Sequence, residues 1–228
     1  MKKLIKLLVQ IIRLMFNGKE YWENRYKDAG TSGLGSYGTE ASFKAHYINN
    51  VIKKYTIKDI NDFGCGDSNQ IKMIKGFERY TGYDVSPTAI EKCKKNLPNQ
   101  SHYNFINDVN HFIPTDLTLS LDVVYHLVEL EIFEEYIHNL FKYSKKYVLI
   151  YSTNRKMEVN EEEDHLKSRI FTEYIEKHLP NATLLDISLF PPKGDVVGFY
   201  LYHIGSKLKL GKPHHDASID DKSINPNG

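Results

Sequence analysis

Hydrophobic residues follow two alternating patterns through the body of the chain. Short apolar runs typical of buried strands are followed by segments whose apolar residues recur every three or four positions, as on one face of a helix. Strands are predicted at Asp59–Phe63, Tyr80–Asp84, Tyr103–Ile106, Leu117–Val124 and Tyr147–Ser152. Helices are predicted after a Thr39 cap and at Asn69–Phe77, Pro87–Asn96 and Glu129–Tyr143. Strands that alternate with helices indicate a parallel sheet covered on both faces.

The last part of the domain departs from this alternation. A helix is expected over His165–His178, followed by strands at Ala182–Phe190 and Val196–Ile204. The turn between the two strands contains proline and glycine, so they should form an antiparallel hairpin. We therefore expect an α/β fold: a Rossmann-like, doubly wound, seven-stranded sheet, mostly parallel, with a C-terminal antiparallel hairpin.

The two ends of the chain have different compositions. Leu4–Phe16 is apolar on one wide helical face, is too short to span a bilayer and precedes no cleavage site of a secretory signal. Two destinations stay open for that face: protein, including the partner in a homodimer, or the surface of a membrane. The predicted organisation is an amphipathic helix at 1–18, a lid segment at 19–56, the catalytic domain at 57–205 and a disordered tail at 206–228.

Charge and cysteine content narrow the function. The chain of 228 residues carries 30 basic and 29 acidic side chains, which is no general footprint for nucleic acid. Cys65 and Cys93 are the only cysteines, and neither has metal-ligand or redox-pair spacing. We therefore expect a cytoplasmic protein, with membrane association as the alternative for its first helix, and no metal site.

The most informative motif is Asp62-Phe-Gly-Cys-Gly66, where a strand ends. Glycine at that point lets the backbone turn sharply and approach a ligand closely. A second strand ends at Asp84, whose carboxylate is placed to accept hydrogen bonds from the ribose hydroxyls of an adenosine ligand. NAD and S-adenosylmethionine (SAM) both fit this much. The third glycine that favours a pyrophosphate is missing, whereas Asp62 suits the α-amino group of SAM.

Over roughly residues 20–205 the sequence is similar to the class I SAM-dependent methyltransferases. The matching segments are the Asp62–Gly66 turn, Gly82-Tyr-Asp-Val-Ser86, Asn107-Asp108 and Asp116–Leu127. Ser68 departs from the glycine common in that family. The resemblance implies that SAM is the cofactor. The residues it implies for cofactor binding are Asp62, Gly64, Cys65, Gly66, Asp84, Val85, Asn107, Asp108 and Asp122.

A narrower resemblance concerns the run from Tyr21 to Tyr37, together with Tyr125-His-Leu127 and Arg169-Ile-Phe171. These segments resemble small bacterial methyltransferases associated with surface-polysaccharide (capsule) gene clusters. That resemblance implies methyl transfer to oxygen of a small molecule or glycan precursor, such as a sugar, a phosphorylated compound or a capsule decoration.

The expected chemistry is an in-line displacement, in which holding the reactants in line supplies most of the rate. A sugar hydroxyl needs to lose a proton, and His126 at the end of the fourth strand is the candidate base; orienting its loop is the alternative role. A lid is predicted from the glycine-rich segment after residue 29, with aromatic side chains facing the sulfonium and Arg25 or Arg169 meeting an anion. The residues expected to contact substrate are Tyr21, Trp22, Arg25, Tyr26, Ser36, Tyr37 and Arg169.

Two other functions compete with this interpretation. An NAD(P)-dependent oxidoreductase is disfavoured by the missing glycine and by the hairpin. The second alternative is a catalytically silent methyltransferase-like subunit that binds a partner through its first helix. It is disfavoured because such a subunit would not need Asp62, Gly64, Gly66 and Asp84.

Overall fold

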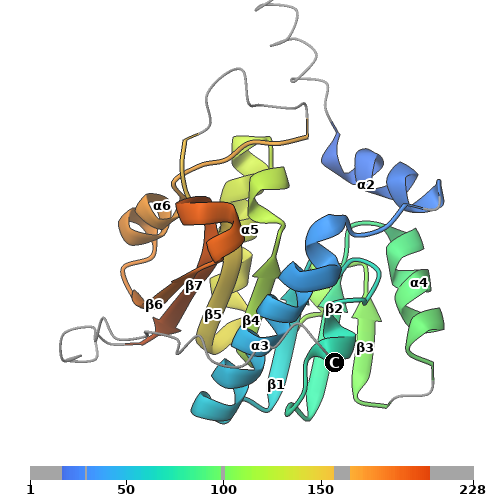
Figure 1. Cartoon of the computed structure of the whole chain (residues 1–228), viewed down its shortest axis with the longest axis horizontal. Coiled ribbons are helices and arrows are strands. Elements are labelled where there is room, and N and C mark those ends of the chain that lie inside the picture. Colours follow the sequence, from blue (N-terminus) through green and yellow to red (C-terminus); the bar gives the residue numbers. More distant parts are fainter. Residues whose placement is uncertain (1–16, 29, 99–100, 157–164, 206–228) are drawn as a thin grey trace, which may run out of the picture.

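A computed structural model describes residues 17–28, 30–98, 101–156 and 165–205. The predicted tail and all but residues 17 and 18 of the first predicted helix lie outside these residues; Asn17 caps the helix that begins at Gly18. The described chain forms one α/β unit whose central sheet has the strand order β3-β2-β1-β4-β5-β7-β6 (Figure 1). Its strands are β1 (Asp59–Phe63), β2 (Arg79–Tyr83), β3 (Tyr103–Ile106), β4 (Thr115–Leu121), β5 (Ser144–Thr153), β6 (Ala182–Leu189) and β7 (Val197–Ile204).

The register of the sheet confirms the predicted fold class. Strands β1 to β5 pair in parallel, whereas β7 pairs antiparallel with both β5 and β6. The turn between β6 and β7 is a 3₁₀ helix, η5 (Pro191–Val196). All five parallel strands therefore end at the same edge of the sheet, and their following loops meet there.

Helices cover both faces of the sheet. On one face lie α3 (Gly38–Tyr55) and α4 (Pro87–Asn96), packed through a cluster that includes Ile48, Ile52 and Ile90. On the other lie α5 (Leu130–Lys142) and α6 (Phe171–His178), packed through Phe133, Ile137 and Phe171. Helix α2 (Gly18–Lys27) lies above the strand ends beside α4 (Figure 1).

Several element predictions were wrong in detail. Instead of a helix over Asn69–Phe77 there is a single 3₁₀ turn, η2 (Ile71–Met73), and α6 begins six residues later than expected, at Phe171. Helix α3 begins at Gly38, after Tyr37 as the N-cap, so Thr39 is not its cap. Strand β4 ends at Leu121, because Asp122 takes a left-handed backbone conformation and Val124–His126 forms the 3₁₀ turn η4.

Candidate cofactor and acceptor site

The loop after β1 is shaped by two glycines with left-handed backbone. Gly64 has φ of 86° and Gly66 has φ of 59°. A Cβ atom on Gly64 would lie 2.4 Å from Val123 Cγ2, and one on Gly66 would lie 2.1 Å from Ser32 Oγ. Larger residues are therefore excluded by both conformation and space. The loop is tied to β2, because Gly64 and Cys65 donate their backbone N–H groups to the Tyr83 carbonyl.

Asp84, the carboxylate at the end of β2, is held by that same loop. Its Oδ2 accepts from the Gly66 N–H at 3.0 Å, and its Oδ1 accepts from the Ser86 N–H at 2.9 Å. The residue is only 7% exposed, and burial raises the pKa of its carboxyl to about 6 despite these two donors. Asp84 therefore points into the site in a fixed orientation.

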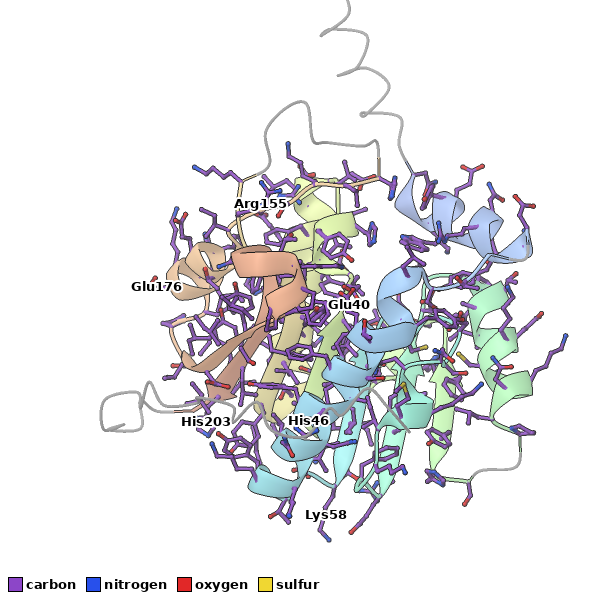
Figure 2. All side chains as sticks on the ribbon, viewed as in Figure 1. Glu40, His46, Lys58, Arg155, Glu176 and His203 are labelled. Carbon is purple, nitrogen blue, oxygen red and sulfur yellow. The ribbon has the colours of Figure 1, made fainter. Side chains whose placement is uncertain are left out.

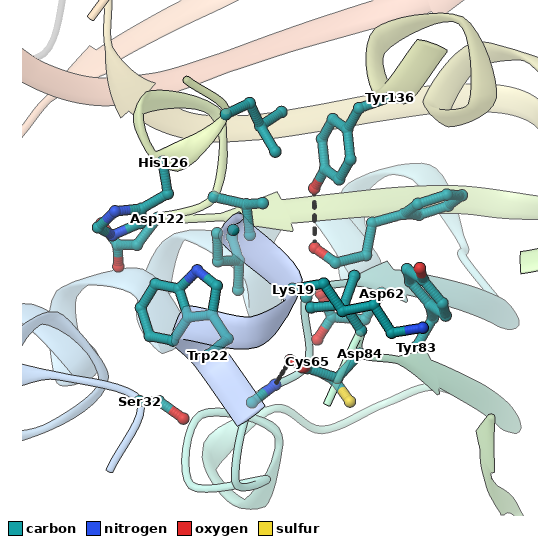
Figure 3. Close-up of a pocket in the computed structure, with 18 of the residues that line it drawn as sticks. Lys19, Trp22, Ser32, Asp62, Cys65, Tyr83, Asp84, Asp122, His126 and Tyr136 are labelled. Atoms are coloured by element: carbon teal, nitrogen blue, oxygen red, sulfur yellow. Dashed lines mark hydrogen bonds between the residues drawn. The ribbon is translucent and has the colours of Figure 1, made fainter. Parts of the chain in front are cut away.

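Two buried oxygen atoms, one at the end of β1 and one just before η2, lack a hydrogen-bond partner among the described residues. Asp62 Oδ2 accepts from the Tyr80 hydroxyl at 2.7 Å, but Asp62 Oδ1 has no partner among the described residues. The same holds for Gln70 Oε1, whose amide nitrogen donates to the Ala41 carbonyl. Both residues line one cavity of about 260 Å³ (Figure 3). Burial raises the pKa of Asp62 to about 7. Because a buried unpaired acceptor is costly, the cavity suits a ligand that brings N–H donors.

The segment before α3 is hydrogen-bonded to this loop. Ser32 Oγ accepts from the Asp67 N–H at 2.8 Å, and the Ser32 N–H donates to Asp67 Oδ2 at 3.1 Å. Tyr37 also donates to Asp67, at 2.7 Å, and Tyr26 Oη lies 3.0 Å from Ser32 Oγ. Helix α2 is fastened separately, because Glu23 accepts hydrogen bonds from Ser86 and Thr88 at the start of α4.

His126 lies in η4, at the β4 side of the cavity, with Trp22 and Asp122 (Figure 3). Its ring packs edge-on against Trp22, with the centroids 4.9 Å apart, and stacks on His165. Burial lowers the pKa of His126 to about 4, so the ring is neutral near pH 7. Nδ1 lies 3.1 Å from the His165 carbonyl oxygen. In the neutral ring this carbonyl favours a proton on Nδ1, which leaves Nε2 as the acceptor.

Asp122 occupies the turn between β4 and His126. Its Oδ2 forms an ion pair with the fully buried Lys44, and its Oδ1 accepts from the Tyr125 hydroxyl at 3.0 Å. Lys44 Nζ also lies 5.2 Å from the centre of the Tyr151 ring, and the Tyr151 hydroxyl donates to Glu40, which pairs with Lys193. Glu40, labelled in Figure 2, lies in the first turn of α3.

The structure brings most, not all, of the predicted site residues to the cavity. The predicted residues that line it are Trp22, Tyr26, Ser36, Asp62, Gly64, Cys65, Gly66, Asp84, Val85, Asp122 and His126. Tyr21 instead stacks on His165 outside the lining, and Tyr37 is bound to Asp67. Asn107 and Asp108 are exposed next to the lining residue Val109, and Asp108 caps the 3₁₀ turn η3 (Val109–His111).

The two arginines expected to meet an anionic substrate are used in other ways. Arg25 Nε donates to the Thr31 carbonyl at 2.9 Å, and its guanidinium lies 5.6 Å from the Trp22 ring centre. Arg169 donates to the carbonyls of Leu127 and Val128 and lies over the Phe133 ring. Neither lines the cavity, so the structure places both as supports of the surrounding segments.

Sequence reasoning missed the contribution of α5 and two buried polar residues. Ile132, Glu135, Tyr136 and Asn139 line the cavity from α5, opposite the strand ends. The helical pattern of α5 predicts which residues are buried, but not that its flank faces a ligand. Gln70 and Lys44 belong to no motif, but Lys44 lies within the apolar stripe of a helix, where a charged residue indicates a buried partner.

Among the described residues, no group of three or more histidine, cysteine, aspartate or glutamate side chains is arranged to hold a metal ion. No helix in this part of the chain is long and apolar enough to cross a membrane.

Comparison with known proteins agrees with the fold. Residues 61–147, which contain the ends of β1, β2 and β4, match a family model described as a methyltransferase domain. No curated protein matches the sequence closely enough to count as a relative. Residues 61–147 therefore form a methyltransferase domain, a type of domain that uses SAM.

Solved structures of low sequence identity share the fold. The N-methyltransferase NodS from Bradyrhizobium japonicum WM9, in complex with S-adenosyl-L-homocysteine (SAH), superposes with a TM-score of 0.64 at 15% identity, covering 83% of this chain and 99% of that one. Magnesium protoporphyrin IX methyltransferase (ChlM) from Synechocystis PCC 6803 with bound SAH gives a TM-score of 0.60 at 12% identity, covering 86% and 99%. The methyltransferase domain of bacterial CtHen1 gives 0.55 at 20% identity, covering 71% and 97%.

Proposed function

We propose that this chain, with its methyltransferase domain at 61–147, transfers the methyl group of SAM to an oxygen of a small polar acceptor, such as a sugar or another glycan precursor. The observation that carries the proposal is one cavity in which the fixed Asp84 carboxylate lies near two unpaired acceptors, Asp62 Oδ1 and Gln70 Oε1. The narrower sequence resemblance, to small methyltransferases of surface-polysaccharide gene clusters, supports oxygen as the acceptor atom.

Each part of SAM has a counterpart in the cavity. Asp84 keeps unused acceptor capacity on both oxygens for the ribose hydroxyls. The α-ammonium supplies the donors that Asp62 and Gln70 lack. Gly64 and Gly66 supply the left-handed backbone of the loop and leave room for Val123 and Ser32 beside it, which fixes the shape of the cavity floor.

In the reaction, the acceptor oxygen attacks the methyl carbon, a C–O bond forms and the C–S bond breaks. The electron pair of that bond stays on sulfur, which becomes the neutral thioether of SAH. The acceptor proton passes to Nε2 of His126, the nitrogen that the contact of Nδ1 with the His165 carbonyl leaves unprotonated. Asp62, Asp84 and the lid hold the reactants in line, and this positioning supplies most of the rate.

The first test is ligand binding by isothermal titration and thermal shift. SAM and SAH should bind and raise the melting temperature, whereas NADH should not. A clear response to NADH with none to saturating SAM would replace the proposal with an oxidoreductase. Binding of SAM without methyl transfer to any acceptor in a broad mass-spectrometric screen would favour a silent binding subunit.

A further inference from the structure

The strand order determines where the acceptor must lie if the proposed function holds, and the present inference rests on that function. The ribose of SAM belongs at the end of β2 and its amino-acid end at the end of β1. The sulfonium joins these parts, and β4 is the next strand in the order β2-β1-β4. The part of the cavity at the end of β4 is lined by Trp22, Ser32, Ser36, Asp122, Val123 and His126. We call it the β4 subsite.

Asp122 is built into this subsite at a conformational cost. Its φ of 60° lies in the left-handed region, which is uncommon for a non-glycine residue, although aspartate tolerates it better than most. Lys44 compensates its charge, and Tyr125 donates to its second oxygen. The lid backbone passes directly over it, because a Cβ atom on Gly35 would lie 2.8 Å from Asp122 Oδ2. Each carboxylate oxygen can accept more than one hydrogen bond, so Asp122 still has acceptor capacity toward the cavity.

The charges around the cavity disfavour an anionic acceptor. Its lining includes the carboxylates Asp62, Asp84, Asp122, Glu129 and Glu135. Among the described lining residues, Lys19 is the only lysine or arginine, and it lies with Tyr83 away from the β4 subsite (Figure 3). Arg25 and Arg169 donate to backbone carbonyls outside the lining. A phosphate at the β4 subsite would face Asp122, whose compensating lysine, Lys44, is already engaged in the ion pair and does not line the cavity. Among the described lining residues no lysine or arginine lies beside the subsite, so the carboxylates of the lining disfavour a second anion there.

We infer that the β4 subsite is an acceptor site for an uncharged hydroxyl-bearing ring, with Asp122 as the residue that selects it. A hydroxyl of the acceptor donates a hydrogen bond to Asp122, and the indole of Trp22 packs against the apolar side of the ring. The carboxylate rejects phosphorylated groups at the same position. Asp122, assigned to the cofactor on the family resemblance, is thereby reassigned to the acceptor.

Trp22 permits a direct binding test, because it is the single tryptophan of the chain and lines this subsite. Intrinsic fluorescence of the SAH-saturated protein would be followed while glucose, galactose and their 6-phosphates are added. We expect saturable responses to at least one free sugar, with its 6-phosphate binding at least about tenfold more weakly. Tighter binding of a 6-phosphate, or no saturable response to any of the four probes, would overturn the inference.

Variants separate selection by Asp122 from general charge. Asp122→Asn should weaken binding of the free sugar and remove most of the tenfold discrimination, while the SAH dissociation constant from titration calorimetry stays within about threefold. Glu131→Gln, which removes an exposed carboxylate near the start of α5, should change neither. Asp122→Asn leaves Lys44 buried without its partner and can prevent folding. In that case the same binding measurements are made on the double variant Lys44→Met/Asp122→Asn.

Two results on these variants decide between the roles of Asp122. A large loss of SAH affinity with unchanged sugar discrimination would return Asp122 to the cofactor and overturn the inference. Failure of the wild-type protein to bind either SAM or SAH would instead refute the proposed function, before any sugar is added.

Discussion

Replacing His126 by asparagine tests how far the fold has altered this imidazole. Burial lowers its pKa from 6.5 to about 4, so between these values the unfolded chain takes up a proton that the folded site does not. The contribution of the neutral His126 ring to the free energy of unfolding is therefore fully present above pH 6.5. It is lost as the pH falls toward 4. Since one pKa unit corresponds to about 1.4 kcal/mol, the loss is about 2 kcal/mol at about pH 5 and about 3 kcal/mol at about pH 4.

The assay is urea unfolding at about pH 7.5 and about pH 5, followed by circular dichroism, with the SAM-free protein. Asp62 and Asp84, whose raised pKa values act with the opposite sign over this range, are present in both proteins, so they cancel in the difference. The wild type should lose about 2 kcal/mol more than His126→Asn between the two pH values. Equal losses would show that the imidazole is not desolvated in the folded state.

The same variant tests the catalytic role of His126. Turnover should fall by roughly 100-fold, with SAM affinity within a few-fold of the wild type. Because the ring is already neutral, the wild-type rate should be flat between about pH 6 and pH 8 as far as His126 is concerned. A wild-type rate that rises through pH 6.5, with no such rise in the variant, would refute the lowered pKa of His126. Full turnover in the variant would refute its role as the general base.

Further predictions concern the cofactor and the first helix. Asp84→Ala should weaken SAM binding by about 2–4 kcal/mol in calorimetry while the circular dichroism spectrum is retained, since two ribose hydrogen bonds to a carboxylate are lost; wild-type affinity would contradict this. SAM affinity should rise between about pH 6 and pH 7.5 as Asp62, with a pKa of about 7, ionises to meet the ammonium, and Asp62→Asn should flatten that profile; an equal slope in the variant would argue against the contact. Deleting residues 1–16 should leave SAM affinity nearly unchanged but alter light scattering or vesicle flotation, and loss of SAM binding would place that segment in the core.

Much of the fold and of the cofactor site was determined by the sequence alone. Buried strands and amphipathic helices have periodicities that local sequence records, which is why β1, α4, α5 and the hairpin appeared near their predicted bounds. Gly64, Gly66 and Asp84 were found for a similar reason. A left-handed turn and a carboxylate at a strand end are local requirements that leave a local pattern.

Only the tertiary structure decided which side chains face one another at that edge. Residues 71–73 form a single 3₁₀ turn in contact with α3, and Gln70 just before them donates to the Ala41 carbonyl. The partner of Asp122 is Lys44, 78 positions earlier, and Arg169 is taken by carbonyls 41 and 42 positions earlier. Contacts of such separation leave no local periodicity, and the low pKa of His126 depends on burial by them. The sequence therefore predicted a cofactor site, whereas the charge around the proposed β4 subsite depended on which distant residues the fold pairs with Lys44 and Arg169.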